Sequence, residues 1–227
     1  MMQYYIIDAP NREKALDFYH RSQQRNLKPN LHTYKILIDL YATIKPYDMK
    51  SALDVLEEMK QKDIEPQAIH YASLIYAYGC CQKDLDSAFD LFHSLKPSHV
   101  NGGVFKALVE ALICNGRIEE AEKYYEEILA KNIKSTSIDN IFIKSYGELG
   151  QLEKAEKIFN SISSSSKDLC TYEEIIKAYV SNKDIEKAKE IAKLLENKNY
   201  SEIIKNNISN LLPSSSSPLY PFLLSCT

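Results

Sequence analysis

The sequence predicts an all-α fold, a right-handed superhelical solenoid of antiparallel helix pairs, and three observations support that prediction. An alanine returns within similar segments at intervals of 33 to 37 residues, which is typical of helical repeats. Apolar residues surround each alanine at helical spacing. Five and a half such units follow one another, enough for stacked helix pairs to share a continuous core. The alanines are Ala15, Ala52, Ala88, Ala121, Ala155 and Ala188.

The segment around Ala121 shows the pattern of each unit. Ile118 lies three residues before this alanine, and Tyr124 and Ile128 lie three and seven residues after it. Spacings of three, four and seven residues place side chains on one face of a helix. Because alanine is the smallest side chain on that face, we expect a neighbouring helix to approach the backbone closely there.

Apolar helices and alanine-bearing helices are expected to alternate along the chain. An amphipathic helix is predicted over residues 11–25. Five units follow, each with an apolar helix, a turn and an alanine-bearing helix. Gly116 and Gly150 lie in two of these turns and suit the left-handed conformation that ends a helix. The apolar helices are expected to begin near Leu31, His70, Val104, Asp139 and Thr171.

The repeats are expected to form a single domain over residues 1–210, and a capping helix is expected at its end, over residues 200–212. Residues 211–227 contain a serine run between prolines and lose the period, so we expect a disordered tail. The first recognisable unit is only the second half of a helix pair. We therefore also expect the chain to be part of a longer gene product.

Composition and spacing exclude several classes of function. The net charge is −3 and the isoelectric point about 6.0, so no strong field attracts nucleic acid or an anionic membrane. No apolar run approaches the roughly 20 residues of a membrane helix. The sequence shows no nucleophile–base arrangement and no phosphate-binding loop. We therefore expect that the protein is not an enzyme and has no small-molecule substrate. The five cysteines form no CxxC pair and the histidines lack metal-ligand spacing, so no metal or other cofactor is expected.

Two repeat families have a period of this length. Tetratricopeptide repeats need small residues at two helix positions, where this chain has bulky ones such as Ile38 and Met59. Residues 33–41, 52–60 and 64–67 together resemble the pentatricopeptide repeat nearly residue by residue. The resemblance extends over roughly residues 9–200.

This resemblance implies a function. Pentatricopeptide proteins bind single-stranded RNA, mostly in mitochondria and plastids, and each repeat reads one base with two or three side chains. The resemblance therefore implies a mitochondrial protein that binds single-stranded RNA and acts in RNA processing, stability or translation, although the first residues show no targeting peptide.

In this family the reading residues are the one just after the motif tyrosine and the last of the same repeat. Carried onto this chain, the pairs are Lys35 with Gln67, Ala72 with Asn101, Lys106 with Ser135, and Asn140 with Asp168, and Glu173 begins a fifth pair. A register shifted by one residue would replace Ser135 with Thr136.

Among these pairs, Asn140 with Asp168 matches a family pair of known preference, which would favour uracil. Lys35 and Lys106 are donors only, and they suit phosphate as well as a base. The family also clamps each base between apolar side chains near the start of neighbouring repeats, and Ile69 alone fits that role well. The residues at this place are His32, Ile69, Gly103, Ser137 and Cys170.

A protein-interaction scaffold of tetratricopeptide type, within a larger assembly, stays open as the alternative. Charges along the presumed concave face are mixed, with Asp39 and Glu110 against Lys144 and Lys177. A groove so close to neutral gains little from counterion release on binding RNA. A positive stripe along that face would favour RNA, whereas an apolar or acidic face would favour a peptide.

Overall fold

The computed structural model describes residues 11–196, and within them it contains helices, turns and loops but no strand. The apolar helices, here called the first helices, are α3 (Leu31–Ala42), α5 (Ala68–Tyr76), α7 (Gly102–Cys114), α9 (Thr136–Glu148) and α11 (Leu169–Ser181). The alanine-bearing helices are α2 (Arg12–Gln24), α4 (Met49–Gln61), α6 (Leu85–Ser94), α8 (Ile118–Ala130), α10 (Leu152–Ser161) and α12 (Ile185–Glu196). A π-helical turn, η1 (Ala77–Cys81), extends α5, and a 3-10 turn, η2 (Pro97–His99), follows α6. The expected capping helix and C-terminal tail lie outside the described residues.

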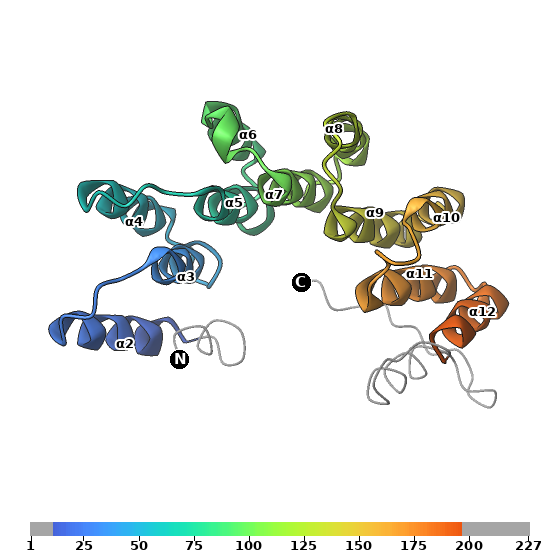
Figure 1. Cartoon of the computed structure of the whole chain (residues 1–227), viewed down its shortest axis with the longest axis horizontal. Coiled ribbons are helices and arrows are strands. Elements are labelled where there is room, and N and C mark those ends of the chain that lie inside the picture. The colour runs from blue at the N-terminus through green and yellow to red at the C-terminus, as the bar shows by residue number, and fades with distance from the viewer. Residues whose placement is uncertain (1–10, 197–227) are drawn as a thin grey trace. The chain divides into compact units, whose positions relative to one another are not determined.

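The helices form two compact units, with the sequence boundary between Lys134 and Ser135. In the first unit, α3 packs against α5 and α5 against α7, while α4, α6 and α8 each pack against the first helix of their own pair (Figure 1). In the second unit, α9 packs against α11, and α10 and α12 pack against these two. Neighbouring helices joined by short turns are antiparallel pairs. The predicted helix-pair architecture is therefore present in each unit, while the single domain over residues 1–210 stays a prediction.

The recurring alanines lie in the core. All six are fully buried, with no exposed surface, although they belong to six different helices. A position that is buried in every repeat must carry a side chain small enough for the helix contact that is repeated there. The burial of all six agrees with the prediction that a neighbouring helix approaches the backbone closely there.

A closer helix contact in the first unit was not predicted. It lies between Gly79 of η1 and Ala111 of α7, where a methyl group added to the glycine would lie 2.1 Å from the alanine Cβ. No real Cβ contact is that short, so only glycine fits. The Asn115 side chain, at the end of α7, then donates from Nδ2 to the carbonyl oxygens of Gly79 and Ala111, at 2.8 and 2.7 Å.

The second unit repeats this arrangement. A methyl group at Gly147 of α9 would lie 2.4 Å from Cβ of Ala178 in α11. Asn182 donates from Nδ2 to Gly147 O and Ala178 O, at 2.8 and 2.7 Å. Each of these contacts joins the backbones of two neighbouring first helices directly, so it holds the spacing between them.

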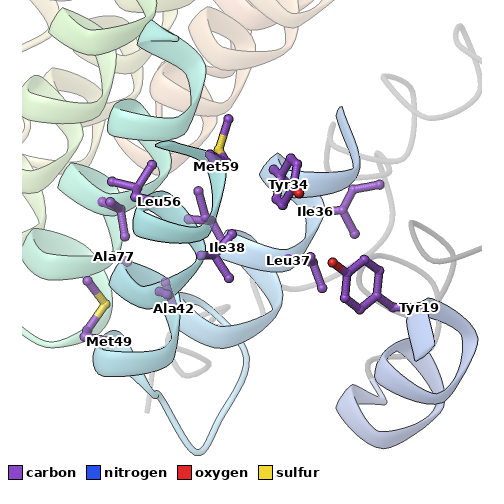
Figure 2. Close-up of a cluster of buried hydrophobic side chains, with 13 residues drawn as sticks. Tyr19, Tyr34, Ile36, Leu37, Ile38, Ala42, Met49, Leu56, Met59 and Ala77 are labelled. Atoms are coloured by element: carbon purple, nitrogen blue, oxygen red, sulfur yellow. The ribbon is translucent and has the colours of Figure 1, made fainter. Parts of the chain in front are cut away.

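One apolar cluster of the first unit extends from α2 to η1, and Figure 2 shows its side chains gathered between these helices. A polar group lies at its edge. Tyr19 and Tyr34 donate their hydroxyl protons to Glu58 Oε1 at 3.3 and 3.4 Å, and Lys62 Nζ donates to the same oxygen at 2.6 Å. Burial, together with the negative charge of Glu58, raises the pKa of Tyr19 to about 12, so its hydroxyl stays a donor. This network links α2, α3 and α4.

The turns after four of the first helices share one backbone conformation. Each has a residue with positive φ, and the expected left-handed conformation of Gly116 and Gly150 is confirmed, with φ of 72° at both. Lys83 and Lys183 hold the equivalent place in the other two turns, with φ of 61° and 65°. Within residues 11–196 no helix combines the length and apolar character needed to cross a membrane.

Candidate nucleic-acid interface

The five reading residues expected from the family register all occupy the same helical position. Each is the fifth residue of a first helix, because these helices begin at equivalent points of their repeats. Lys35 is in α3, Ala72 in α5, Lys106 in α7, Asn140 in α9 and Glu173 in α11. Equal register means that the five side chains leave their helices in equivalent directions. We call these five residues the fifth-position row.

The partner residues at the end of each repeat are also equivalent. Gln67, Asn101, Ser135 and Asp168 are the N-cap residues of α5, α7, α9 and α11. Thr136 is already the first helical residue of α9, which places Ser135 in the same register as the other three. Each partner therefore lies at the start of the first helix that follows its own repeat.

Asn140 and Asp168 lie side by side, as the sequence predicted. Asn140 Nδ2 donates to Asp168 Oδ1 across 3.3 Å. Asp168 also accepts from Thr171, both from its backbone N–H and from its hydroxyl, at 2.8 Å each. Burial alone would raise the pKa of Asp168, but these hydrogen bonds from Thr171 and Asn140 outweigh it and lower the pKa. The carboxylate is therefore ionised at neutral pH and holds the Asn140 amide in one orientation.

The other amide atom of Asn140 has no partner. The residue is only 6% exposed, and its side-chain Oδ1 is buried without a hydrogen bond. Since buried polar atoms are nearly always satisfied, an unpaired acceptor beside a fixed donor needs an explanation. A ligand that offers one donor and one acceptor at this place would satisfy both halves of the amide.

The remaining reading pairs differ from this one. Among the described residues, none of the other three shows a hydrogen bond or ion pair between its own members. Asn101 uses its side-chain oxygen to accept from the N–H groups of Gly103 and Val104, at 3.0 and 3.2 Å. Ala72 has no side-chain group that could form a hydrogen bond.

Both lysines of the fifth-position row are paired within their own helices. Lys106 Nζ lies 2.8 Å from Glu110 Oε1, and Lys35 forms an ion pair with Asp39. In each case the acidic residue comes four residues later, where side chains of a helix are neighbours. The positive charge that a phosphate would need is therefore already neutralised at these two places.

The expected clamp positions are the second residues of the first helices. Ile69 of α5 is 49% exposed, and Tyr76 of the same helix, seven residues later, is 37% exposed. Burial and then the charges of neighbouring groups raise the pKa of Tyr76 to about 12, so it is a neutral phenol. Tyr76 was not predicted as a functional residue, although its spacing from Ile69 places both on one face of α5. His32, Gly103, Ser137 and Cys170, at the equivalent second positions, are exposed as well.

Comparison with known families decides between the two repeat types. A family model described as "Pentatricopeptide repeat-containing protein" matches residues 13–128, and the model of the single pentatricopeptide repeat matches residues 140–166 and 170–200. The chain belongs to the pentatricopeptide repeat family. The family assignment made from the sequence is thus confirmed across both units.

The curated relatives are longer pentatricopeptide proteins. "Pentatricopeptide repeat-containing protein 5, mitochondrial" of Schizosaccharomyces pombe is 33% identical over 224 residues, which cover 94% of this chain but 18% of the relative. A mitochondrial pentatricopeptide repeat-containing protein of Arabidopsis thaliana is 27% identical over 192 residues, covering 81% of this chain and 30% of the relative. The chain thus spans less than a third of the length of these relatives.

Solved structures of the pentatricopeptide repeat protein PPR10 share the fold. The complex of PPR10 with an 18-nt psaJ RNA element superposes with a TM-score of 0.63 at 18% identity, over 88% of this chain and 28% of PPR10. The structure of PPR10 from maize gives a TM-score of 0.53 at 16% identity, over 92% of this chain and 30% of that one. The prediction of a helical-repeat solenoid is confirmed.

Proposed function

We propose that this pentatricopeptide chain binds single-stranded RNA through the first helices of its two units, without catalysing a reaction. The observation that carries the proposal is the Asn140–Asp168 pair, in which a fixed amide presents a donor and an unpaired acceptor. The equal register of the fifth-position row supports it, because a nucleic acid offers equivalent bases at regular intervals. The crystal structure of PPR10 in complex with an RNA element agrees with this ligand class.

We further propose that the protein acts in mitochondria, on the processing, stability or translation of organellar transcripts. The support comes from the relatives, since those of Schizosaccharomyces pombe and Arabidopsis thaliana described above are both named as mitochondrial. Imaging of a tagged protein would test the location. A steady nuclear or cytosolic signal from a full-length gene product would contradict it.

The Asn140 amide suits uracil better than cytosine. Uracil presents an N–H donor next to carbonyl acceptors on its Watson–Crick edge, whereas cytosine has an acceptor nitrogen in place of that N–H. Asn140 Oδ1 would accept from the uracil N–H, and the second Nδ2 proton would reach a uracil carbonyl. With cytosine, two acceptors would face each other. Because Oδ1 is buried in the free protein, the side chains that cover it must move aside as the base arrives.

A base-substitution experiment tests this assignment. Binding of the parent and of Asn140→Ala would be measured on a set of oligonucleotides in which each position is varied through the four bases. The parent is expected to prefer uracil at one position by about tenfold, in line with about 1–3 kcal/mol for a good base contact, and Asn140→Ala to lose that preference. Asn160→Ala, the same substitution at an exposed site on α10, is the matched control.

Two results would contradict the proposal at different levels. If the parent prefers uracil and Asn140→Ala keeps the same preference, the role of Asn140 is wrong while RNA binding stands. If the parent binds no RNA at low salt, the proposed function itself is wrong. A protein-binding scaffold is then the second candidate. The ion pairing of Lys35 and Lys106 and the exposed Ile69 and Tyr76 favour that candidate.

A further inference from the structure

Two cysteine sulfurs lie next to each other in the first unit. Cys80 Sγ and Cys114 Sγ are 2.8 Å apart, although 34 residues separate them in sequence. Cys80 is the thirteenth residue counted from the start of α5, through η1, and Cys114 is the thirteenth of α7. The two thiols therefore occupy equivalent places on neighbouring first helices, and neither is part of the candidate base-reading positions.

Their proximity is a consequence of the backbone and does not depend on flexible side chains. Gly79, directly before Cys80, packs against Ala111, three residues before Cys114, at a distance that admits no larger residue. The Asn115 side chain, directly after Cys114, donates to Gly79 O. The contact and the hydrogen bond flank the thiols and hold their two helices together. A disulfide needs an S–S distance of about 2.0 Å, so its formation requires the sulfurs to move by less than about 1 Å.

The helix itself changes character at this place. Ala77–Cys81 forms a π-helical turn, in which the N–H of Gln82 donates to Ala77 O at 3.0 Å. Single π-helical turns inside α-helices occur frequently at functional sites. The equivalent segment of α7 is regular α-helix. The π-turn thus sets apart the segment that carries Cys80.

The two thiols differ in their surroundings. A hydrogen bond to Cys114 and burial raise the pKa of Cys80, whereas Cys114 is exposed. Cys114 is also the more exposed of the two sulfurs, so a dissolved disulfide reaches it first. Lys83 Nζ donates to the Cys114 carbonyl oxygen at 2.7 Å, which places a positive charge nearby, while Glu110 contributes a negative one. Cys114 is therefore the attacking thiol and Cys80 the resolving one.

We propose that Cys80 and Cys114 form a reversible disulfide by exchange with a small-molecule disulfide such as oxidised glutathione. The Cys114 thiolate attacks one glutathione sulfur, breaks the glutathione disulfide and releases one glutathione. Cys80 then attacks Cys114 Sγ in the mixed disulfide and releases the second glutathione. The hydrogens of the two cysteines end on the two glutathione thiols. The two-electron oxidation of the protein equals the two-electron reduction of oxidised glutathione.

The disulfide would covalently link α7 to the π-turn that extends α5. It would fix the spacing of two neighbouring first helices beside Tyr76 and Glu110, which come four residues before Cys80 and Cys114. A link that closes a loop of this length constrains the unfolded chain strongly. The oxidised protein is therefore expected to melt about 5 °C or more above the reduced one.

Peptide mapping in glutathione buffers tests the proposal without any RNA. The full chain would be equilibrated at graded ratios of oxidised to reduced glutathione, alkylated and digested, and its linked peptides identified by mass spectrometry. The parent and Cys81→Ser are expected to yield the Cys80–Cys114 link, and dithiothreitol to remove it. Cys81→Ser is the matched control because Cys81 lies next to Cys80 in the same π-turn. Cys80→Ser is expected to keep one glutathione on Cys114.

Three outcomes would overturn the proposal. One is a parent in which Cys114 links to Cys81 or Cys170 instead of Cys80. Another is a parent that carries only glutathione adducts or intermolecular links. The third is a parent whose oxidised and reduced forms melt at the same temperature although the Cys80–Cys114 link has formed. All three are read on the parent protein, so the test does not depend on the folding of a variant.

Discussion

At Gly147, two first helices of the second unit are in close contact. An added methyl group would lie 2.4 Å from Ala178 Cβ and 2.8 Å from its Cα, and the second of these is a backbone atom that no rotamer change can move away. Gly147→Ala is therefore expected to lower the free energy of unfolding by about 1–3 kcal/mol, the usual cost of overpacking, or more if the helices must separate. Thermal or denaturant unfolding would measure the loss.

The matched control for this substitution is Gly102→Ala. Gly102 is the first residue of α7, and its added methyl group would meet only Ile133 Cγ2 at an ordinary 3.5 Å. Alanine has the better helix propensity, so this variant is expected to be neutral or up to about 1 kcal/mol more stable. Equal stability of Gly147→Ala and Gly102→Ala would show that the two first helices are not in contact at Gly147.

Sequence reasoning finds a buried residue when its position returns in every repeat. Ala121 was predicted to be buried because five other alanines share its place, and all are buried. Gly79 and Gly147 hold their close contacts in only two repeats, so no period marks them. The contact of Asn140 with Asp168 was predicted from the family register. The unpaired Asn140 Oδ1 could not be predicted from the sequence, because the burial of a single atom depends on the packing around it.

At the scale of the helix and its turn, four of the turns that follow first helices share a left-handed residue, which is glycine in two of them and lysine in the other two. Gly116 has φ of 72° with no atom near enough to touch an added methyl group, so its requirement is conformational alone. Gly116→Ala is expected to lower the free energy of unfolding by about 1–2 kcal/mol, the cost of this conformation for a residue with a Cβ. Denaturant unfolding would measure it, and a gain in stability would contradict the assigned turn.

The reverse substitution is available in the equivalent turn of the second unit. Lys183 adopts φ of 65°, although it has a Cβ, and its backbone N–H donates to Val180 O at 3.0 Å as Gly116 N–H donates to Ile113 O at 2.9 Å. Lys183→Gly is therefore expected to raise stability by up to about 1 kcal/mol in the same measurement. The two variants together separate the backbone effect from any effect of the side chains.

The order of the helices was predictable because apolar spacing and turn residues agree in each repeat. Their starts are set by local chemistry, as where Asn30 and Asp168 accept from the backbone N–H of the third helical residue. The π-turn at Ala77–Cys81 was not predictable. It lies where Gly79 contacts α7, and the residues in this contact are distant in sequence. The spacing of apolar residues along one helix does not indicate such a contact.

At the scale of the whole molecule, the positive and negative charges nearly cancel, and individual lysines are also paired with nearby carboxylates. The net charge is −3 over 227 residues, and the two fifth-position lysines each face an acidic residue of their own helix. Affinity for RNA at low salt comes mainly from phosphates that are neutralised by free cations. The proposed binding surface is therefore expected to bind RNA weakly, with an affinity that depends little on salt. Breaking the ion pairs of the two lysines is expected to raise both the affinity and its salt dependence.

The variant Asp39→Asn/Glu110→Gln would release Lys35 and Lys106 without changing their number. If these lysines face the RNA, affinity at low salt is expected to rise. The slope of log affinity against log salt is expected to steepen by about 0.7 for each lysine that gains a phosphate, with base preference unchanged. Glu57→Gln frees Lys60, 3.4 Å away on the alanine-bearing helix α4, and is the matched control. Since ion pairs near the surface contribute about 0.2–1 kcal/mol, these variants are expected to fold. Equal steepening in the control would mean that RNA responds to overall charge and that the fifth-position row does not contact the phosphates.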